Sequence, residues 1–154
     1  MSKRILLFTL TTILIFTNWY YYNAYHNEVD GRLADFYNLQ FQIEYMKGDV
    51  RSGVDPSGNH WEQEMFSHYG YFLNLEGEDG EKLDVYVNPD GQYNKLFRII
   101  QLHPLTKEFD EYKIMIGFDS ADEAKKQYLL HYPDNWQGCG GIEQISLKEL
   151  RNER

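Results

Sequence analysis

Residues 68–87 read HYGYFLNLEGEDGEKLDVYV, and this stretch decides how the centre of the chain folds. Two apolar segments, 69–73 and 83–87, flank an acidic loop that contains Asp79-Gly80. An Asp-Gly pair between apolar segments is a strong signal for a β-hairpin. In 83–87, Leu and Val alternate with Asp84 and Tyr86, which predicts a strand with one apolar face and one face that bears polar groups.

The carboxylates of this stretch allow two interpretations. Asp79 and Glu81 flank a glycine, so their side chains can converge where the chain turns, and Asp84 follows on the strand. Mg²⁺ prefers oxygen ligands, usually one or two carboxylates together with water and phosphate. An acidic, solvated hairpin loop is the commoner meaning of such spacing, and a metal site is the alternative. The spacing does not match the calcium loop of an EF-hand.

The composition of the whole chain limits its class. The 154 residues are enough for one domain, and a 42% hydrophobic, 16% aromatic composition indicates a packed core. The formal net charge of −9 argues against binding nucleic acid, whose phosphates would be repelled, and suits metal ions or basic partners. Cys139 is the single cysteine, so neither an intrachain disulfide nor a thiolate metal cluster is expected.

The N-terminal segment has the pattern of a signal. Lys3-Arg4 precede the apolar residues 5–17, and the aromatic residues 19–22 follow. With that aromatic belt, the segment approaches the about 20 residues of a membrane span. We expect an N-terminal hydrophobic helix over 1–27 that acts as an uncleaved signal anchor, with a cleaved signal peptide or a buried core helix as alternatives. Membrane attachment through 5–25 would place the folded domain outside the cytoplasm, in the periplasm, or secreted.

A linker is expected over 28–38, followed by strands and then helices. Strands are predicted at 39–45, 69–73, 83–87, 95–102 and 111–118, with turns over 46–61 and a loop at 137–141. Ser120 begins a capping-box pattern and should open a helix that runs to about residue 132 and buries Ala124 and Tyr128. Ser146 should open a short second helix. The order predicts an α+β fold with a small barrel-like sheet of about five strands.

Other charged residues could contribute chemistry. Asp110, Glu111 and Lys113 lie in the segment FDEYK, and Glu111 and Lys113 share one strand face, most often as a surface ion pair. Glu44 lies on the polar face of the first strand and Arg51 in the turn after it. The chain contains no nucleophile elbow, no Walker A motif and no HExxH zinc motif.

Taken together, these motifs resemble those of a known family. Tyr69-Gly70-Tyr71, an acidic loop and Asp79-Gly80-Glu81-x-x-Asp84-Val85 are similar to the YGY and DGDxxDV signature of the soluble family I inorganic pyrophosphatases. Closer still is the resemblance to the compact pyrophosphatase-like domain of phage and mobile-element polyvalent proteins. Its motifs correspond, in order, to Ile43-Glu44, RSGVD at 51–55, Trp61, the YGY, and FDEYKIMIGFDSADEA at 109–124. The resemblance predicts a pyrophosphatase-like domain over 39–154.

The resemblance implies a fold and a set of roles. The fold would be an OB-like five-stranded β-barrel with flanking C-terminal helices. The residues that would hold divalent metal, Mg²⁺ with Mn²⁺ as an alternative, are Asp79, Glu81, Asp84, Asp110 and Glu111. The residues that would contact phosphate or water are Glu44, Arg51, Tyr69 and Lys113. Glu81 stands where the family normally has Asp.

Three functions remain open at this point. The resemblance implies metal-dependent hydrolysis of inorganic pyrophosphate, or of a related small phosphoanhydride, by an Mg²⁺-activated water that attacks phosphorus. The first alternative is a membrane-tethered accessory or binding module that keeps the fold but has little or no activity. The second is an unrelated interaction domain whose acidic loop is only a hairpin.

Overall fold

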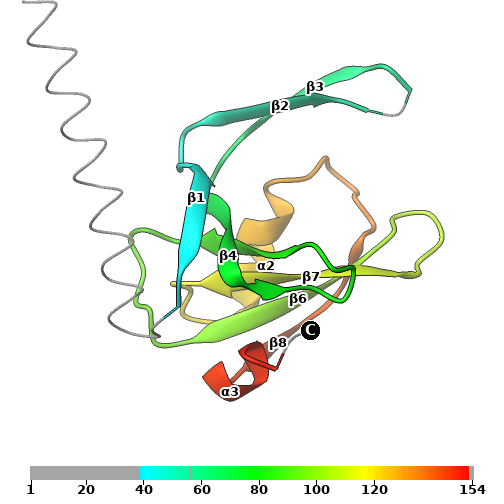
Figure 1. Cartoon of the computed structure of the whole chain (residues 1–154). Coiled ribbons are helices and arrows are strands. Elements are labelled where there is room, and N and C mark those ends of the chain that lie inside the picture. Colours follow the sequence, from blue (N-terminus) through cyan, green and yellow to red (C-terminus); the bar gives the residue numbers. More distant parts are fainter. Residues whose placement is uncertain (1–38, 56, 153–154) are drawn as a thin grey trace, which may run out of the picture.

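A computed structural model of the chain describes residues 39–55 and 57–152 and shows a mostly β domain (Figure 1). Its elements, in chain order, are β1 (Phe41–Tyr45), β2 (Val50–Val54), β3 (His60–Glu64), β4 (His68–Glu76), β5 (Lys82–Val87), β6 (Leu96–Leu102), β7 (Phe109–Ile116), α2 (Ala121–Leu129), β8 (Cys139–Ile145) and α3 (Leu147–Leu150). The five predicted strands are all present, and the hairpin predicted from 68–87 is the antiparallel pair β4–β5.

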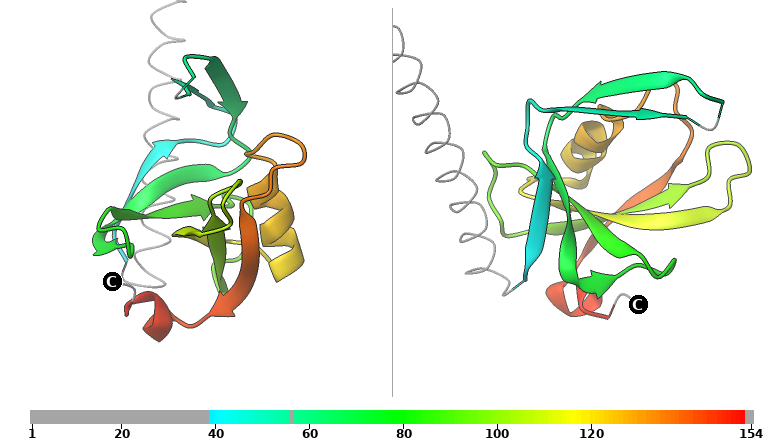
Figure 2. Two further views of the ribbon diagram at one scale, coloured as in Figure 1. Left: turned by 90° about the vertical axis from the view of Figure 1, so that its right-hand side faces the viewer. Right: turned by 45° about the horizontal axis from the view of Figure 1, so that its top comes forward.

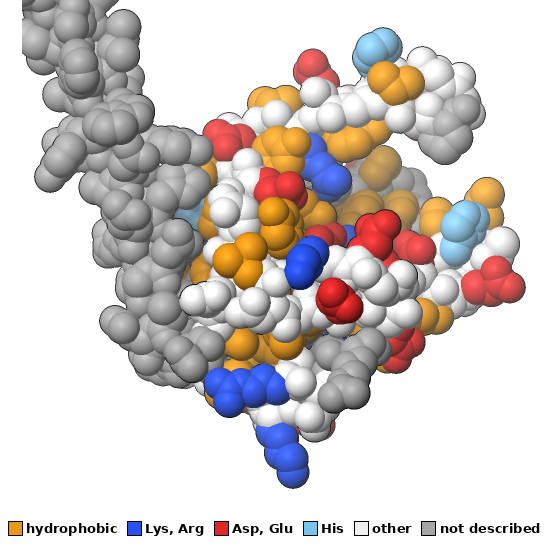
Figure 3. All heavy atoms as spheres, in the orientation of Figure 1, with side chains coloured by type: hydrophobic (Ala, Val, Ile, Leu, Met, Phe, Trp, Pro, Cys, Tyr) orange, Lys and Arg blue, Asp and Glu red, His pale blue; other side chains and the backbone are white. Residues whose placement is uncertain are grey.

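The strands form one large sheet and one separate hairpin. The large sheet has six strands in the order β1-β4-β5-β7-β6-β8, and β2 and β3 pair only with each other. Within the large sheet β5 and β7 are parallel, and every other pair is antiparallel. The twisted sheet carries α2 on one face, and the β2–β3 hairpin overhangs the body of the molecule (Figures 2 and 3).

The predicted OB-like barrel of five strands is not formed. The sheet is mixed and open because β1 and β8 end it on opposite edges and do not pair with each other. Three strands lie wholly or partly in segments that were predicted as turns or loops. The predicted turn region 46–61 contains β2 and the start of β3, and the predicted loop 137–141 contains the start of β8.

Glycine explains why β8 was missed. Glycine is depleted in strands, so CGG at 139–141 resembles a loop. In the structure a Cβ atom on Gly140 would lie 2.7 Å from Cγ of Leu102, so the strand needs glycine there to pack against the neighbouring strand.

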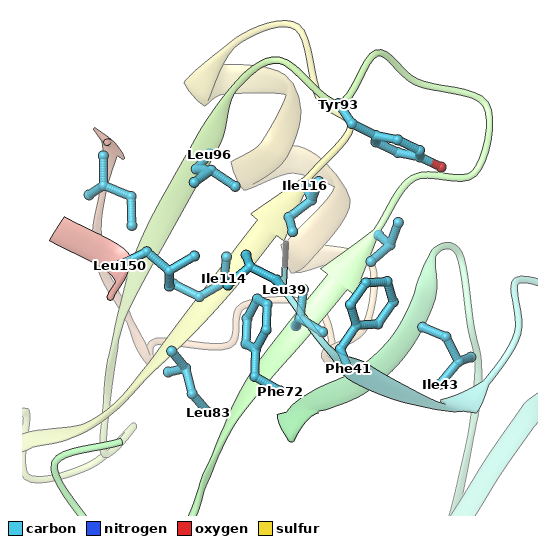
Figure 4. Close-up of a cluster of buried hydrophobic side chains, with 13 residues drawn as sticks. Leu39, Phe41, Ile43, Phe72, Leu83, Tyr93, Leu96, Ile114, Ile116 and Leu150 are labelled. Atoms are coloured by element: carbon cyan, nitrogen blue, oxygen red, sulfur yellow. The ribbon is translucent and has the colours of Figure 1, made fainter. Parts of the chain in front are cut away.

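Apolar side chains cover both faces of the sheet. On one face Leu83, Val85 and Val87 are at most 1% exposed and pack with Phe72 and Ile114, among the residues drawn in Figure 4. On the other face Tyr86 packs with a second cluster that includes the buried side chains of α2. The predicted alternation along 83–87 is therefore confirmed, although both faces are largely covered.

The predicted starts of both helices are confirmed. The Oγ atom of Ser120 accepts a hydrogen bond from the backbone N–H of Glu123, and Ala124 and Tyr128 are fully buried. The helix ends at Leu129, three residues before the predicted end. There the N–H groups of His131 and Tyr132 bond to carbonyls only three residues back. Ser146 forms the expected capping box at the start of α3.

The predicted anchor over 1–27, with its hydrophobic helix, and the linker over 28–38 lie outside the described residues. Among the residues that are described, no helix is both long enough and apolar enough to cross a membrane.

Candidate functional site

Asp84 lies at the centre of a polar cluster on the face of the sheet that α2 partly covers. Its Oδ2 atom accepts hydrogen bonds from the Tyr69 hydroxyl and from Nζ of Lys113, each at 2.5 Å. The strand order explains this contact, because β5 lies between β4 and β7 and the register places Asp84 beside Lys113. Tyr69 and Lys113, two predicted site residues that are far apart in the sequence, thus both contact Asp84, a predicted metal ligand.

Lys113 joins two carboxylates. Besides Asp84, its Nζ contacts Oε2 of Glu111 at 2.8 Å, so the predicted sharing of a strand face by Glu111 and Lys113 is confirmed. The pair is not an ordinary surface ion pair, however, because Lys113 is only 6% exposed. Burial raises the pKa of Glu111, and the positive charge of Lys113 opposes that rise.

A glutamine that the sequence analysis did not single out holds the acidic side chains. The amide nitrogen of Gln101 donates to Asp110 at 2.9 Å and to Glu111 at 2.7 Å. Its amide oxygen accepts from the hydroxyls of Tyr128 at 2.6 Å and Tyr132 at 2.9 Å. The amide thus has all four of its hydrogen bonds and fixes the direction of both carboxylates. The only sequence signal for it is a polar residue at a buried position of the predicted strand 95–102.

Arg51 reaches the cluster from the separate hairpin. The residue lies on β2, not in a turn as predicted. Its guanidinium carbon lies 4.9 Å from the ring centroid of Tyr69, 5.7 Å from that of Trp61 and 5.9 Å from that of Tyr45. Aromatic faces attract a guanidinium without neutralising it. Since Arg51 forms no ion pair with another described residue, its charge is available to an anion.

The structure does not bring every predicted site residue into this cluster. Asp79 and Glu81 lie exposed in the turn between β4 and β5, where Oδ1 of Asp79 accepts a hydrogen bond from the N–H of Glu81 at 3.0 Å. Glu44 is exposed on β1. Among the described residues, no hydrogen bond or ion pair links these three side chains to Asp84, Lys113 or Glu111. We call the connected set of Tyr69, Asp84, Asp110, Glu111 and Lys113 the acidic cluster.

Comparison with known proteins identifies the family. The model of the family described as Inorganic Pyrophosphatase matches residues 22–154, which is most of the chain. The chain belongs to the inorganic pyrophosphatase family. Pyrophosphatases in general hydrolyse pyrophosphate and use divalent metals such as Mg²⁺. The match begins before residue 39, where the domain was predicted to start.

Among solved structures, the chain is similar to an inorganic pyrophosphatase from Coxiella burnetii, with 15% sequence identity and a TM-score of 0.39. The similarity covers 75% of this chain and 90% of that one. No curated protein matches the chain.

The acidic cluster can be tested for its fit to the divalent metal of such pyrophosphatases. Within 39–55 and 57–152, no three His, Cys, Asp or Glu side chains are grouped as a metal site. Asp84 and Glu111 nevertheless converge on one positive charge, the ammonium of Lys113. Their donor atoms are hard oxygens, and Mg²⁺ in phosphate-binding proteins commonly needs only one or two carboxylates, with water and phosphate supplying the rest. The chemistry of the donor set therefore fits Mg²⁺ bound together with a phosphate substrate.

Proposed function

We propose that the chain hydrolyses inorganic pyrophosphate or another small phosphoanhydride at the acidic cluster. The family supports the reaction type. The observation that favours this location is Lys113, a buried cation that lies between two carboxylates while Arg51 lies over the neighbouring Tyr69 ring. A substrate that is an anion and is bound together with a divalent metal needs both kinds of group. Carboxylates can hold the metal, and fixed cations can hold the phosphates.

Lys113 and Arg51 would bind the phosphate oxygens. An ammonium has three N–H donors, and Asp84 and Glu111 account for two of them, so one remains for a phosphate oxygen. As the oxygen of water bonds to one phosphorus, the bond from that phosphorus to the bridging oxygen breaks. The bridging oxygen leaves with the other phosphate. The two cations would stabilise the negative charge that develops on this leaving group.

The acidic residues would hold the metal. Asp84, Glu111 and Asp110 are proposed ligands of Mg²⁺ or Mn²⁺, and Asp79 and Glu81 are proposed to add to them from the turn before β5. The metal, when bound, supplies charge neutralisation and a more acidic water molecule. Glu44 is proposed to contact water or metal from β1.

Tyr69 is proposed to act only as a hydrogen-bond donor. Burial and the neighbouring charge of Asp84 raise the pKa of its hydroxyl above the ordinary value of 10.0, so the group stays protonated at neutral pH. It can therefore donate a hydrogen bond to Asp84 or to a phosphate oxygen, but it does not act as a base.

Phosphate release by the full chain tests the proposal. Wild type, Asp84→Asn and the control Asp122→Asn would be assayed with pyrophosphate, with and without MgCl₂. Asp122 is an exposed residue in the first turn of α2 and gives the same chemical change away from the cluster. We expect Mg²⁺-dependent release that falls about 100-fold in Asp84→Asn and stays near wild type in the control. Equal release by wild type and Asp84→Asn, or none from wild type, would contradict the proposal.

One observation favours a second candidate, a module that binds pyrophosphate without turning it over. Oδ2 of Asp84 already accepts hydrogen bonds from both Tyr69 and Lys113, and no group of three metal ligands is present among the described residues. Calorimetric titration of the full chain with pyrophosphate, with and without Mg²⁺, separates the two. Saturable binding without phosphate release would support the binding module, and turnover would exclude it.

We also propose that residues 1–27 anchor the chain to a membrane, or export it, with the domain outside the cytoplasm. The charge pattern around the apolar residues 5–17 is the support for this. Membrane fractionation with an immunoblot, together with N-terminal sequencing of the mature protein, tests it. A full-length chain found only in the soluble cytoplasmic fraction would contradict it.

A further inference from the structure

A cavity of about 300 Å³ lies under the β2–β3 hairpin. Trp61 and Gln63 of the hairpin line it on one side, and Tyr86, His131 and Tyr132 line it on the other. The overhanging hairpin is visible in Figure 3. The amide nitrogen of Gln63 donates to the carbonyl oxygen of Leu130 at 3.2 Å, which ties the hairpin to the C-terminal end of α2. The cavity thus lies between two parts of the fold that this hydrogen bond joins.

Four aromatic side chains line this cavity: Trp61, Tyr86, His131 and Tyr132. Trp61 is 39% exposed. Its ring lies against Gly53, where a Cβ atom would come within 2.6 Å of the ring. Opposite, the rings of Tyr86 and His131 lie 4.8 Å apart, and Tyr132 is stacked on Trp136 with ring centroids 3.9 Å apart. Each ring therefore contacts a neighbouring residue that restricts its position. Such rigid aromatic surfaces are suited to stacking against a planar ligand.

The inner wall carries no charge at neutral pH. The Nε2 atom of His131 accepts a hydrogen bond from the N–H of Phe66 at 3.0 Å, which requires a neutral ring, and burial lowers its pKa to about 4. The remaining polar groups of the lining are Arg51, Glu62, Gln63 and the tyrosine hydroxyl groups. An apolar cavity with a few polar groups is typical of a site for an uncharged organic group.

Arg51 connects the cavity to the acidic cluster. It lines the cavity, and its guanidinium carbon lies between the rings of Trp61 at 5.7 Å and Tyr69 at 4.9 Å. The ring of Tyr69 in turn lies 4.9 Å from that of Tyr86, and its hydroxyl binds Asp84. A ligand with an aromatic group in the cavity could therefore place a linked phosphate beside Arg51 and the acidic cluster.

We propose that the cavity binds the base of a nucleoside diphosphate whose phosphoanhydride lies at the acidic cluster. Inorganic pyrophosphate has no part that would fill an apolar cavity, whereas a nucleoside diphosphate carries the same anhydride together with a flat, uncharged base. The carboxylate of Glu62 and the amide oxygen of Gln63 can accept hydrogen bonds from the edge of the base. The proposal deepens the proposed function and rests on it for the position of the phosphates.

The reaction differs from pyrophosphate hydrolysis only in its substrate. Water bonds to the β-phosphorus, the bond from this phosphorus to the bridging oxygen breaks, and that oxygen leaves on the α-phosphate. The products are a nucleoside monophosphate and inorganic phosphate, with a proton released to solvent. No oxidant, reductant or second substrate is needed.

A binding experiment tests the cavity separately from catalysis. The full chain would be titrated by calorimetry, in Mg²⁺, with α,β-methylene-ADP and with methylenediphosphonate, which is the corresponding pyrophosphate analogue. Both have carbon in place of the bridging oxygen. We expect the nucleotide analogue to bind about tenfold more tightly, which is typical of one stacked base. In Trp61→Ala this advantage should disappear, and in Val54→Ala, an exposed position of the same hairpin, it should remain.

Each result bears on the proposal. Equal affinity of wild type for the two analogues, or a nucleotide advantage that survives in Trp61→Ala, would overturn it. A turnover assay with ADP and pyrophosphate then measures the ratio of the two kcat/KM values, which should fall about tenfold in Trp61→Ala. If wild type hydrolyses neither substrate, the proposed function fails, and the binding measurement still decides whether the cavity recognises a base.

Discussion

Replacing Lys113 by methionine should test the arrangement of the acidic cluster. Methionine keeps much of the length of the lysine side chain but removes the ammonium that contacts Asp84 and Glu111. The Lys113 side chain is 8% exposed, and those of Asp84 and Glu111 are 18% and 25% exposed. Removing one partner of a buried ion pair costs about 3–5 kcal/mol, because a charge is left without compensation. Both carboxylates retain some contact with water, so we expect the lower end, about 3 kcal/mol at pH 7.

The loss should depend on pH in a defined direction. Burial raises the pKa of Glu111 above its ordinary value of 4.5, while Lys113 opposes this rise. A carboxyl group whose pKa is raised by folding contributes stability that is fully present below the unfolded pKa and is lost as pH rises through the folded pKa. Removing Lys113 raises the pKa of Glu111 further. The variant should therefore lose more stability relative to wild type at pH 7 than at pH 5.

Urea unfolding followed by tryptophan fluorescence measures both effects. With a slope of about 1–3 kcal/mol per molar urea, the midpoint at pH 7 should fall by about 1–3 M. Lys148→Met, at an exposed position in α3, is the matched control and should leave the midpoint nearly unchanged. An unchanged midpoint for Lys113→Met, or the same loss at pH 5 and pH 7, would refute the reasoning.

Three other substitutions test separate features of the fold and the site. Gln101→Leu should lower the free energy of unfolding in urea by about 2 kcal/mol, because the hydroxyls of two tyrosines lose their acceptor. It should also lower kcat/KM for pyrophosphate, because Asp110 and Glu111 lose their shared donor. In wild type, burial lowers the pKa of His131 from 6.5 to about 4, so its contribution of about 3 kcal/mol is present above pH 6.5 and lost as pH falls through 4. His131→Gln should flatten that part of the stability profile, and an unaltered profile would contradict the assignment. Gly70→Ala should cost about 3 kcal/mol or more, because the new Cβ would lie 1.8 Å from the carbonyl oxygen of Gln42, and a near-normal melting temperature would count against the β1–β4 packing.

Sequence patterns predicted the strands that have alternating or continuous apolar residues and the helices that begin with an N-cap serine. These patterns failed for strands whose residues are mostly polar or glycine. The hairpin β2–β3 carries polar residues on most of its surface, since it is not a layer of the main core, so its strands read as turns. The start of β8 is rich in glycine for the close approach of Leu102. Edge and satellite strands of this kind have no hydrophobic period to detect.

The candidate site was predicted in part. The family resemblance named every charged residue that the structure gathers around Asp84, although spacing alone favoured a solvated hairpin. It could not reveal Gln101, because a lone glutamine in an apolar strand has no distinctive motif. It also could not reveal that Trp61 and Arg51 of the separate β2–β3 hairpin line a cavity together with Tyr86, since this proximity depends on tertiary structure.

The position of the site follows from strand register more than from the local motif. Asp84 and Lys113 meet because β5 and β7 pair in parallel with these two residues directly opposite each other. The same register places Val85 beside Ile114 and Val87 beside Ile116 on the apolar face. A shift of one residue would turn Lys113 toward that apolar face and bring Ile114 to the polar one. The hydrophobic residues of the two strands therefore help to specify the acidic cluster, because keeping them on the apolar face also keeps Lys113 and Asp84 together on the polar face.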